Sequence, residues 1–191
     1  DIRRFNTGAV RQKTEGTTRL VSVGSLRTAK NYFYLLEAFE HLKDEPVELH
    51  IYGTGHLHGS LQQQINETGV RVILKGEVKN VEEVVPQYDI YVMSSAFEGF
   101  SLSVLEAMAM QMPLLLSDIP SFREQCAETA IYFELDNVAD LVKKIRLMAA
   151  GKNMRDTMSL AAKERAVHNF TLAHHMAGLR KIYSEALNPG T

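Results

Sequence analysis

The sequence predicts an α/β fold, a doubly wound parallel sheet of about six strands followed by a C-terminal helical tail. Two observations lead to this prediction. Short runs rich in β-branched and aliphatic residues, each ending in small residues, alternate with amphipathic helical stretches. The chain also has 191 residues, of which 45% are hydrophobic and 23% charged, a mixture typical of a globular domain that can bury a core without disulfide bonds.

Each predicted element follows from its local pattern. The strands are the short apolar runs 19–23, 47–52, 70–75, 89–93, 114–117 and 130–133. The helices are the stretches with apolar residues at a helical spacing, 32–42, 57–67, 81–88, 137–150, 154–167 and 171–187. In the first of these, Leu35, Leu36 and Phe39 share one face, and Asn137 is the expected N-cap of the fourth.

Residues 1–18 carry no sustained period and are predicted to be a linker from a missing N-terminal domain, whereas 19–191 form one domain. The chain starts without Met and without the basic and apolar regions of a signal peptide, which indicates a cut within a longer protein.

Charge and cysteine content narrow the function classes. The net charge of −2 removes the electrostatic argument for nucleic-acid binding or for binding to an anionic membrane. No apolar run approaches the roughly 20 residues of a membrane span. The one cysteine, Cys126, favours a reducing compartment, so we expect a cytoplasmic protein.

The loops after the predicted strands are the expected ligand-binding segments, because ligands of open parallel sheets lie beyond the carboxyl ends of the strands. These loops are 24–31, 53–55, 76–80 and 94–101, and three of the four carry Gly next to the strand end. Such glycines can simply end strands, or they can let the backbone approach a ligand. The pattern alone leaves both interpretations open.

The segment from Glu98 to Glu106 is the most informative. A helix start near Ser103 would leave the amides of 102–104 unpaired and suited to a phosphate, with one carboxylate on each side to accept hydrogen bonds from sugar hydroxyls. Ser103-x-x-Glu106 also matches a capping box, and Glu98 can equally be a surface charge. Lys30 is either a solvated helix-end lysine or a point charge for a phosphate.

Residues 98–109, Glu-Gly-Phe-Ser-Leu-Ser-Val-Leu-Glu-Ala-Met-Ala, resemble the E-x7-E signature of the group 1 retaining glycosyltransferases, a family with the GT-B fold. The resemblance runs from Val21 to about Phe133 and includes Lys30, the Gly53-x-Gly55 turn and Pro113. It implies that the chain is the C-terminal, Rossmann-like donor-binding domain of an enzyme of polysaccharide or glycolipid synthesis. That enzyme would move a sugar from a nucleotide diphosphate to an acceptor hydroxyl.

The resemblance also assigns residues to roles. Glu98 would be the catalytic residue and would contact the donor sugar, Glu106 would bind the ribose hydroxyls, and Lys30 the diphosphate. The backbone at Val78 would contact the base. Amides toward the donor sugar and phosphate would come from the turn between the two glutamates, at Gly99, Phe100, Ser101 and Leu102.

No metal and no cofactor are implied, because lysine and helix amides would neutralise the leaving diphosphate. An acceptor glycan or lipid-linked glycan would bind the missing N-terminal domain, so this chain alone should bind donor weakly and turn over negligibly. The whole protein would be cytoplasmic or peripheral to the inner face of a membrane.

The chain departs from the family pattern at several positions. Ser25 stands where the family often has Arg, and Arg27 is the residue that would take over this phosphate contact. Asn31, Ser101 and Gln111 stand where Gly is common. Two other functions remain open: a nucleotide-sugar epimerase of the same fold, and a non-catalytic nucleotide-binding module.

Overall fold

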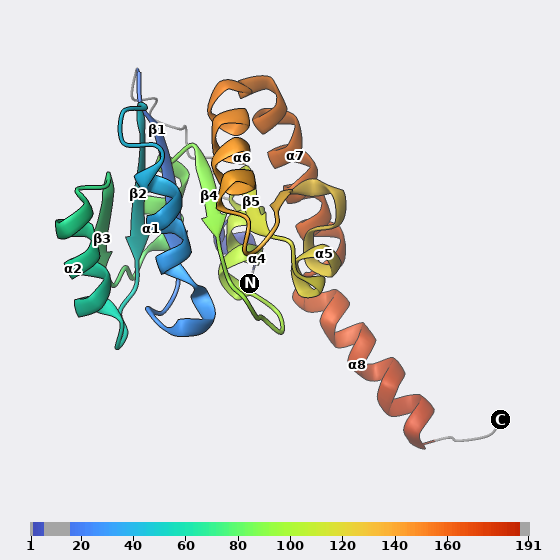
Figure 1. The fold of residues 1–191 in the computed structure, drawn as a ribbon. Coiled ribbons are helices and arrows are strands. Elements are labelled where there is room, and N and C mark those ends of the chain that lie inside the picture. Colours follow the sequence, from blue (N-terminus) through green and yellow to red (C-terminus); the bar gives the residue numbers. More distant parts are fainter. Residues whose placement is uncertain (1, 6–15, 188–191) are drawn as a thin grey trace.

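The computed structural model describes residues 2–5 and 16–187. Its sheet consists of β1 (Thr18–Val23), β2 (Val47–Tyr52), β3 (Val72–Gly76), β4 (Ile90–Met93), β5 (Leu114–Ser117) and β6 (Ile131–Phe133). All neighbouring strands are parallel, in the order β3-β2-β1-β4-β5-β6. The predicted fold class is therefore confirmed (Figure 1).

The α-helices are α1 (Tyr32–Glu40), α2 (His58–Thr68), α3 (Val81–Val84), α4 (Leu102–Ala109), α5 (Pro120–Cys126), α6 (Val138–Ala150), α7 (Lys152–Asn169) and α8 (Leu172–Leu187). Short 3-10 helices occur at η1 (Ile2–Phe5), η2 (Thr28–Lys30), η3 (Val85–Gln87) and η4 (Ala127–Thr129). The N-cap prediction is confirmed, because the Asn137 side chain accepts a hydrogen bond from the Asp140 amide.

Alternation along the strands separates two apolar cores. In β1, Leu20 packs into the core on the face covered by α1, α2 and α6, while Val21 packs into the core on the opposite face with α4 and α5. Figure 1 shows α1, α2 and α6 in front of the sheet and α4 behind it. Both faces are covered over the middle of the sheet, as parallel strands require.

Two predicted segments form other structure than expected. The stretch 81–88 forms α3 and the 3-10 helix η3 rather than one helix, because Pro86 has no amide proton to continue the hydrogen-bond ladder. Of the predicted linker, residues 1 and 6–15 lie outside the described residues, Ile2–Phe5 forms η1, and Thr18 already belongs to β1.

Candidate functional site

The candidate site lies where the strand order reverses. From β1 the chain builds outward through β2 and β3, then returns to add β4 on the other side of β1. The loop after β1, 24–31, and the loop after β4, 94–101, therefore leave the same edge of the sheet side by side. Open α/β sheets bind ligands in the crevice at such a point.

Lys30 and Glu98 meet across these two loops. Lys30 Nζ lies 2.6 Å from Glu98 Oε1, and the two side chains are only 8% and 11% exposed. The Ser95 hydroxyl donates a second hydrogen bond to the same carboxylate oxygen, at 2.9 Å. The structure thus brings together two of the residues that the sequence singled out, as a nearly buried ion pair rather than as solvated surface charges.

The two loops also brace each other through buried polar contacts. The Ser94 hydroxyl lies 2.9 Å from the Lys30 carbonyl and 3.0 Å from the Asn31 carbonyl. The Ala96 amide donates to the Ala29 carbonyl at 2.9 Å. Since these bonds fix the backbone on both sides of the ion pair, the position of Lys30 and Glu98 is set by the loops and not by the flexible side chains alone.

Gly24 leaves the space through which the Lys30 side chain passes. A Cβ atom on Gly24 would lie 2.9 Å from the Tyr32 hydroxyl and 3.1 Å from Lys30 Cε. Tyr32 is fully buried with its hydroxyl next to Gly24, and burial raises its pKa to about 12. The phenol is therefore neutral.

The glycines after β2 serve contact between loops. A Cβ atom on Gly53 would lie 1.9 Å from the Gly24 carbonyl oxygen, and one on Gly55 would lie 2.3 Å from the Leu26 carbonyl oxygen. The Leu26 amide donates to the Thr54 carbonyl at 2.9 Å. The sequence left open whether these glycines only end strands or allow a close approach of the backbone. The structure shows a close approach, and the partner is the loop after β1.

Helix α4 begins one residue before the predicted start. Ser101 is its N-cap, and the Ser101 hydroxyl accepts a hydrogen bond from the Val104 amide at 3.4 Å. Ser103 is thus inside the first turn, so the capping box between Ser103 and Glu106 is wrong. The amides of Leu102 and Ser103 have no hydrogen-bond partner in the part of the chain that the structure describes.

Glu106 takes no part in the Lys30–Glu98 contact. It is half-buried, and burial raises its pKa, partly opposed by the positive charge of Arg4 and increased by the negative charge of Glu82. Within the described residues its carboxylate makes no hydrogen bond or ion pair. It lines a cavity of about 740 Å³ whose lining residues include neither Lys30 nor Glu98.

This cavity is bounded by η1, α4 and the turn between α7 and α8. Its lining is mainly apolar and includes Phe5, Phe100, Leu105 and Phe170, and the rings of Phe100 and Phe170 meet edge to face with centroids 5.4 Å apart. A carboxylate in an apolar wall can accept hydrogen bonds from a ligand more favourably than one in open water.

The 3-10 helix η1 lies between α4 and the loop after β3. Arg4 Nε donates to Glu82 Oε1 at 2.7 Å, and Arg4 Nη2 donates to the Lys79 carbonyl at 3.4 Å. Val78, the expected base contact, is half-buried against the second core next to this loop. The predicted base and ribose contacts therefore both lie near η1.

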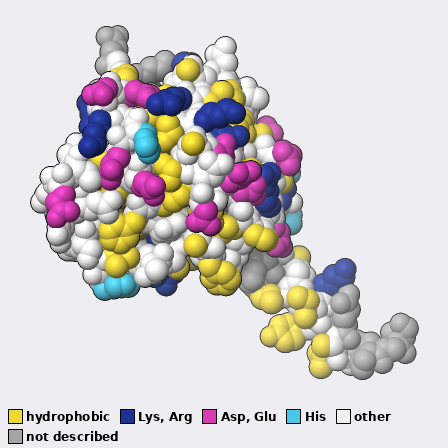
Figure 2. Space-filling view, in the orientation of Figure 1, with side chains coloured by type: hydrophobic (Ala, Val, Ile, Leu, Met, Phe, Trp, Pro, Cys, Tyr) yellow, Lys and Arg dark blue, Asp and Glu magenta, His cyan; other side chains and the backbone are white. Residues whose placement is uncertain are grey.

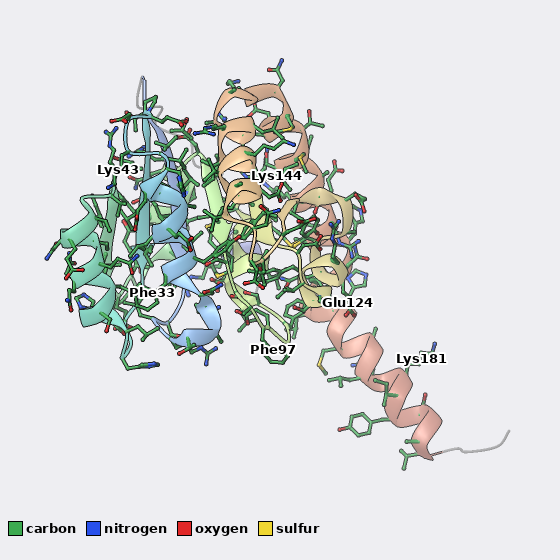
Figure 3. The ribbon with its side chains drawn as sticks, in the orientation of Figure 1. Phe33, Lys43, Phe97, Glu124, Lys144 and Lys181 are labelled. Atoms are coloured by element: carbon green, nitrogen blue, oxygen red, sulfur yellow. The ribbon has the colours of Figure 1, made fainter. Side chains whose placement is uncertain are left out.

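Apart from Ser101, which is 3% exposed, the remaining predicted contacts lie at the exposed rims of the two loops. Ser25 and Arg27 are exposed, and neither side chain has a partner among the described residues. In the other loop, Gly99 is exposed, Phe100 is 48% exposed and Leu102 is 68% exposed. Figure 3 shows the neighbouring Phe97 at the tip of the β4–α4 loop.

The substitutions at expected glycine positions have different outcomes. Asn31 and Gln111 adopt the left-handed conformation, with φ of 53° and 59°, whereas Ser101 has an extended backbone with φ of −90°. Asn tolerates the left-handed region better than most residues. The sequence also gave no reason to select Gln125 of α5, which is 1% exposed and hydrogen-bonded to Ser101.

Two further findings bear on the kind of site. Among the described residues, no group of three or more His, Cys, Asp or Glu side chains is arranged to hold a metal ion. Over the same residues, no helix combines the length and apolarity needed to cross a membrane.

Residues 5–165 match the model of a protein family described as glycosyl transferases group 1. A named relative is the N-acetylgalactosamine-N,N'-diacetylbacillosaminyl-diphospho-undecaprenol 4-alpha-N-acetylgalactosaminyltransferase of Campylobacter jejuni, 28% identical over 77% of this chain and 41% of its own length. Another is the poly(ribitol-phosphate) alpha-N-acetylglucosaminyltransferase of Staphylococcus aureus, 25% identical over 68% of this chain and 27% of its own length. The chain thus spans less than half the length of either relative.

Solved structures share the fold. A glycosyltransferase from Rickettsia africae superimposes on all of this chain with a TM-score of 0.87, at 16% identity, over 56% of its own length. HepE of Anabaena in complex with UDP-glucose superimposes on 88% of this chain with a TM-score of 0.80, at 17% identity, over 49% of its own length.

Proposed function

The chain belongs to the group 1 glycosyltransferases, and on that premise we propose that it is the donor-binding domain of a retaining glycosyltransferase. The whole enzyme would move a sugar from a nucleotide diphosphate to an acceptor hydroxyl. The observation that carries the proposal is the buried Lys30–Glu98 pair at the carboxyl edge between β1 and β4. Buried charges held this way have a high desolvation cost, and a substrate that uses both of them gives a reason to keep them.

The chemistry of the two loops suits an activated sugar. When the sugar–phosphate bond breaks, negative charge grows on the leaving diphosphate, and Lys30 with the open amides of Leu102 and Ser103 can stabilise it. Glu98 lies next to Lys30, so its carboxylate can meet the hydroxyls of the sugar that is transferred. Ser25 and Arg27, on the exposed rim of the β1 loop, would contact the outer phosphate.

Glu106 and Val78 would bind the nucleoside. Both lie near η1, and neither belongs to the Lys30–Glu98 contact, which would suit the nucleoside end of an extended donor. Within the described residues, the Glu106 carboxylate makes no hydrogen bond or ion pair. It can therefore accept two hydrogen bonds from the vicinal hydroxyls of ribose. Gly99, Phe100 and Leu102 lie between the two glutamates in the sequence and would face the phosphate and sugar, whereas the Ser101 amide is already bonded to Gln125.

The acceptor would bind to a second domain. The two named relatives are each more than twice as long as the part that matches this chain, and their names describe acceptors that are a lipid-linked sugar and a ribitol-phosphate polymer. We therefore propose polysaccharide or glycolipid synthesis, with residues 1–18 leading from an N-terminal acceptor domain. Without that domain, this chain should bind donor but transfer sugar negligibly.

A thermal-shift screen tests the proposal. We would measure the melting temperature of this chain with UDP-glucose, UDP-N-acetylglucosamine, GDP-mannose and ADP-glucose at millimolar concentrations. A ligand that binds only the folded state raises this temperature, so at least one nucleotide sugar should do so. The proposal fails if none of the four shifts the melting temperature.

Calorimetry on a variant then tests the ribose contact. Glu106→Gln should weaken binding of the selected nucleotide sugar by about tenfold or more, since hydrogen bonds to a charged acceptor contribute about 1.5–3 kcal/mol. Glu67→Gln, on the exposed surface of α2, is the matched control and should bind as the parent does. Unchanged binding by Glu106→Gln would reject the ribose assignment while leaving the donor site itself in place.

A further inference from the structure

Gln125 occupies a place in α5 where an apolar residue would be expected. It is 1% exposed and stands between Phe122 and Cys126, which are both fully buried in the core beneath α4 and α5. A buried primary amide costs free energy unless its donor and acceptor are both satisfied. In Gln125, the side-chain donor and the side-chain acceptor both form hydrogen bonds to one residue of the β4–α4 loop.

The contact is a paired amide bridge to the Ser101 backbone. The Ser101 amide donates to Gln125 Oε1 at 3.2 Å, and Gln125 Nε2 donates to the Ser101 carbonyl at 2.9 Å. The Ser101 carbonyl also accepts from the Leu105 amide at 3.0 Å, and the Ser101 hydroxyl accepts from the Val104 amide. All three polar groups of Ser101 are therefore bonded: the amide to Gln125, the hydroxyl within α4, and the carbonyl to both.

The opposite end of the same loop is held from the same part of the fold. The Ser117 hydroxyl, at the end of β5, donates to the Ser95 carbonyl at 2.6 Å, and both residues are fully buried. Between these two fixed points, the loop rises to Phe97, which is 77% exposed. Figure 3 shows Phe97 at the loop tip and Glu124, the neighbour of Gln125, on α5. Glu98 lies between the two fixed points.

Gln125 is itself anchored to another helix. Arg165 of α7 donates from Nε to the Gln125 carbonyl at 2.8 Å and from Nη2 to the Glu124 carbonyl at 2.8 Å. The end of α5 therefore cannot rotate freely, and the side chain of Gln125 has a fixed origin. A rigid support of this kind transmits its position to the residues that it bonds.

We propose that Gln125 is a positioning residue of the donor site, whose side-chain amide fixes the start of α4 and the loop that carries Glu98. This inference rests on the proposed function for its consequence, which is tighter binding of the nucleotide sugar. It concerns a residue that would not touch the ligand, and its action runs through the Ser101 backbone to the open amides of Leu102 and Ser103.

The test variant is Gln125→Met, which keeps the length of the side chain and removes both hydrogen bonds. Hydrogen exchange monitored by NMR should show faster exchange at the amides of Ser101, Val104 and Leu105, with no change in β1 and β2. Affinity for the nucleotide sugar selected by the thermal-shift screen should fall on the order of tenfold to a hundredfold, because small displacements of binding groups carry costs of that size.

Ser159→Ala is the matched control. Ser159 is 1% exposed, and its hydroxyl bonds to the Asp156 carbonyl within α7, so the variant also removes a buried hydrogen bond. It should change neither exchange at the start of α4 nor nucleotide-sugar affinity. A loss of affinity in this control equal to that of Gln125→Met would overturn the inference, since general destabilisation would then explain both.

The outcomes separate this inference from the proposed function. Unchanged exchange at Ser101, Val104 and Leu105 in folded Gln125→Met overturns it whether or not any nucleotide sugar binds. Faster exchange at these amides with unchanged nucleotide-sugar affinity also overturns it, because the hydrogen bonds between Gln125 and Ser101 would then not contribute to donor binding. If the parent binds none of the nucleotide sugars, the proposed function fails on the screen, and the positioning role fails with it. If Gln125→Met does not fold, Gln125→Glu, which retains an acceptor for the Ser101 amide, is measured in the same way.

Discussion

Glu106 combines a proposed role in the donor site with a cost to stability. Burial raises its pKa above the ordinary value of 4.5, so the folded chain holds a proton there more tightly than the unfolded chain does. Stability from this group is therefore lost as the pH rises from about 4.5 through the folded pKa, and the loss is complete above it. A carboxylate kept in such a place indicates a use other than folding.

Glu106→Gln should consequently be more stable than the parent at neutral pH, and the two should converge as the pH falls below the ordinary pKa of a glutamate. Urea unfolding at a series of pH values measures this difference. Glu67→Gln is the control, with a difference that stays small at every pH. A neutral-pH loss of stability in Glu106→Gln would mean that the carboxylate makes a stabilising contact that outweighs its burial.

The Lys30–Glu98 pair should behave as a coupled unit. In Lys30→Met, the nearly buried Glu98 carboxylate keeps its hydrogen bond from Ser95 but loses its ion pair. Removing one member of a buried ion pair costs about 3–5 kcal/mol of stability. The double variant Lys30→Met/Glu98→Gln should lose less than the sum of the single losses. Urea unfolding of the four proteins closes this cycle, and strictly additive losses would show that the two charges do not interact.

At the residue scale, the sequence indicated the charged residues of the candidate site but not the buried polar residue that bonds to the same loop. Lys30, Glu98 and Glu106 stand out because charged residues beside strand ends and helix starts suggest anionic or hydroxylated ligands. Gln125 does not stand out, since one polar residue in a short helix is ordinary in a sequence. Its meaning depends on burial and on the Ser101 backbone 24 positions away, which no local pattern encodes.

At the element scale, hydrophobic periodicity predicted all six strands, and the boundaries moved by no more than two residues. The stretch 81–88 was predicted as one helix because its apolar spacing is helical, but Pro86 interrupts the backbone ladder. The sequence predicts that α4 starts near Ser103, and Ser103 with Glu106 also matches a capping box. Ser101 is the N-cap instead: its backbone is extended, its hydroxyl accepts from the Val104 amide, and its own amide donates to Gln125.

The contact between the β1 and β2 loops gives a prediction at this scale. Gly53 has φ of 142°, and a Cβ atom there would lie 1.9 Å from the Gly24 carbonyl oxygen, so Gly53→Ala must displace one loop. We expect a loss of about 3 kcal/mol or more, as strain and backbone collision together produce. Since Gly24 adjoins the Lys30 side chain, nucleotide-sugar affinity should fall as well.

Gly59→Ala is the paired control for this prediction. Gly59 lies in α2 with nothing within 4 Å of its would-be Cβ atom, so alanine there should stabilise the chain by up to about 1 kcal/mol. Thermal unfolding of both variants compares the same chemical change in two environments. Equal and small effects would show that the β2 loop moves aside freely and does not support the β1 loop.

At the scale of the whole molecule, α8 is the feature that the isolated chain does not explain. Figure 1 shows it projecting from the body of the domain, and Figure 2 shows hydrophobic side chains gathered along it. Four exposed residues at helical spacing form this apolar stripe: Leu172 at 67%, Met176 at 43%, Tyr183 at 65% and Leu187 at 78%. A stripe of this kind normally packs against another surface.

The second domain proposed above would supply such a surface. The α7–α8 turn also lines the cavity beside Glu106, so a domain seated on α8 would lie next to the nucleoside end of the donor site. Sequence periodicity predicted the helix itself, 171–187 against the observed Leu172–Leu187, but could not show that its apolar face stays uncovered. Coverage depends on where the helix projects, which only the assembled fold determines.

The double variant Tyr183→Glu/Leu187→Glu tests this role of α8. In the chain as it stands, both side chains are exposed, so thermal unfolding should change by no more than about 0.5 kcal/mol. In a longer chain that includes the proposed acceptor domain, the same charges would be forced into an apolar contact, and both the melting temperature and sugar transfer should fall. Ser184→Glu, outside the apolar stripe of α8, should leave the longer chain unaffected. Equal behaviour of the double variant in the short and the long chain would mean that the acceptor domain does not rest on this helix, because an interface of apolar side chains does not accept two carboxylates without cost.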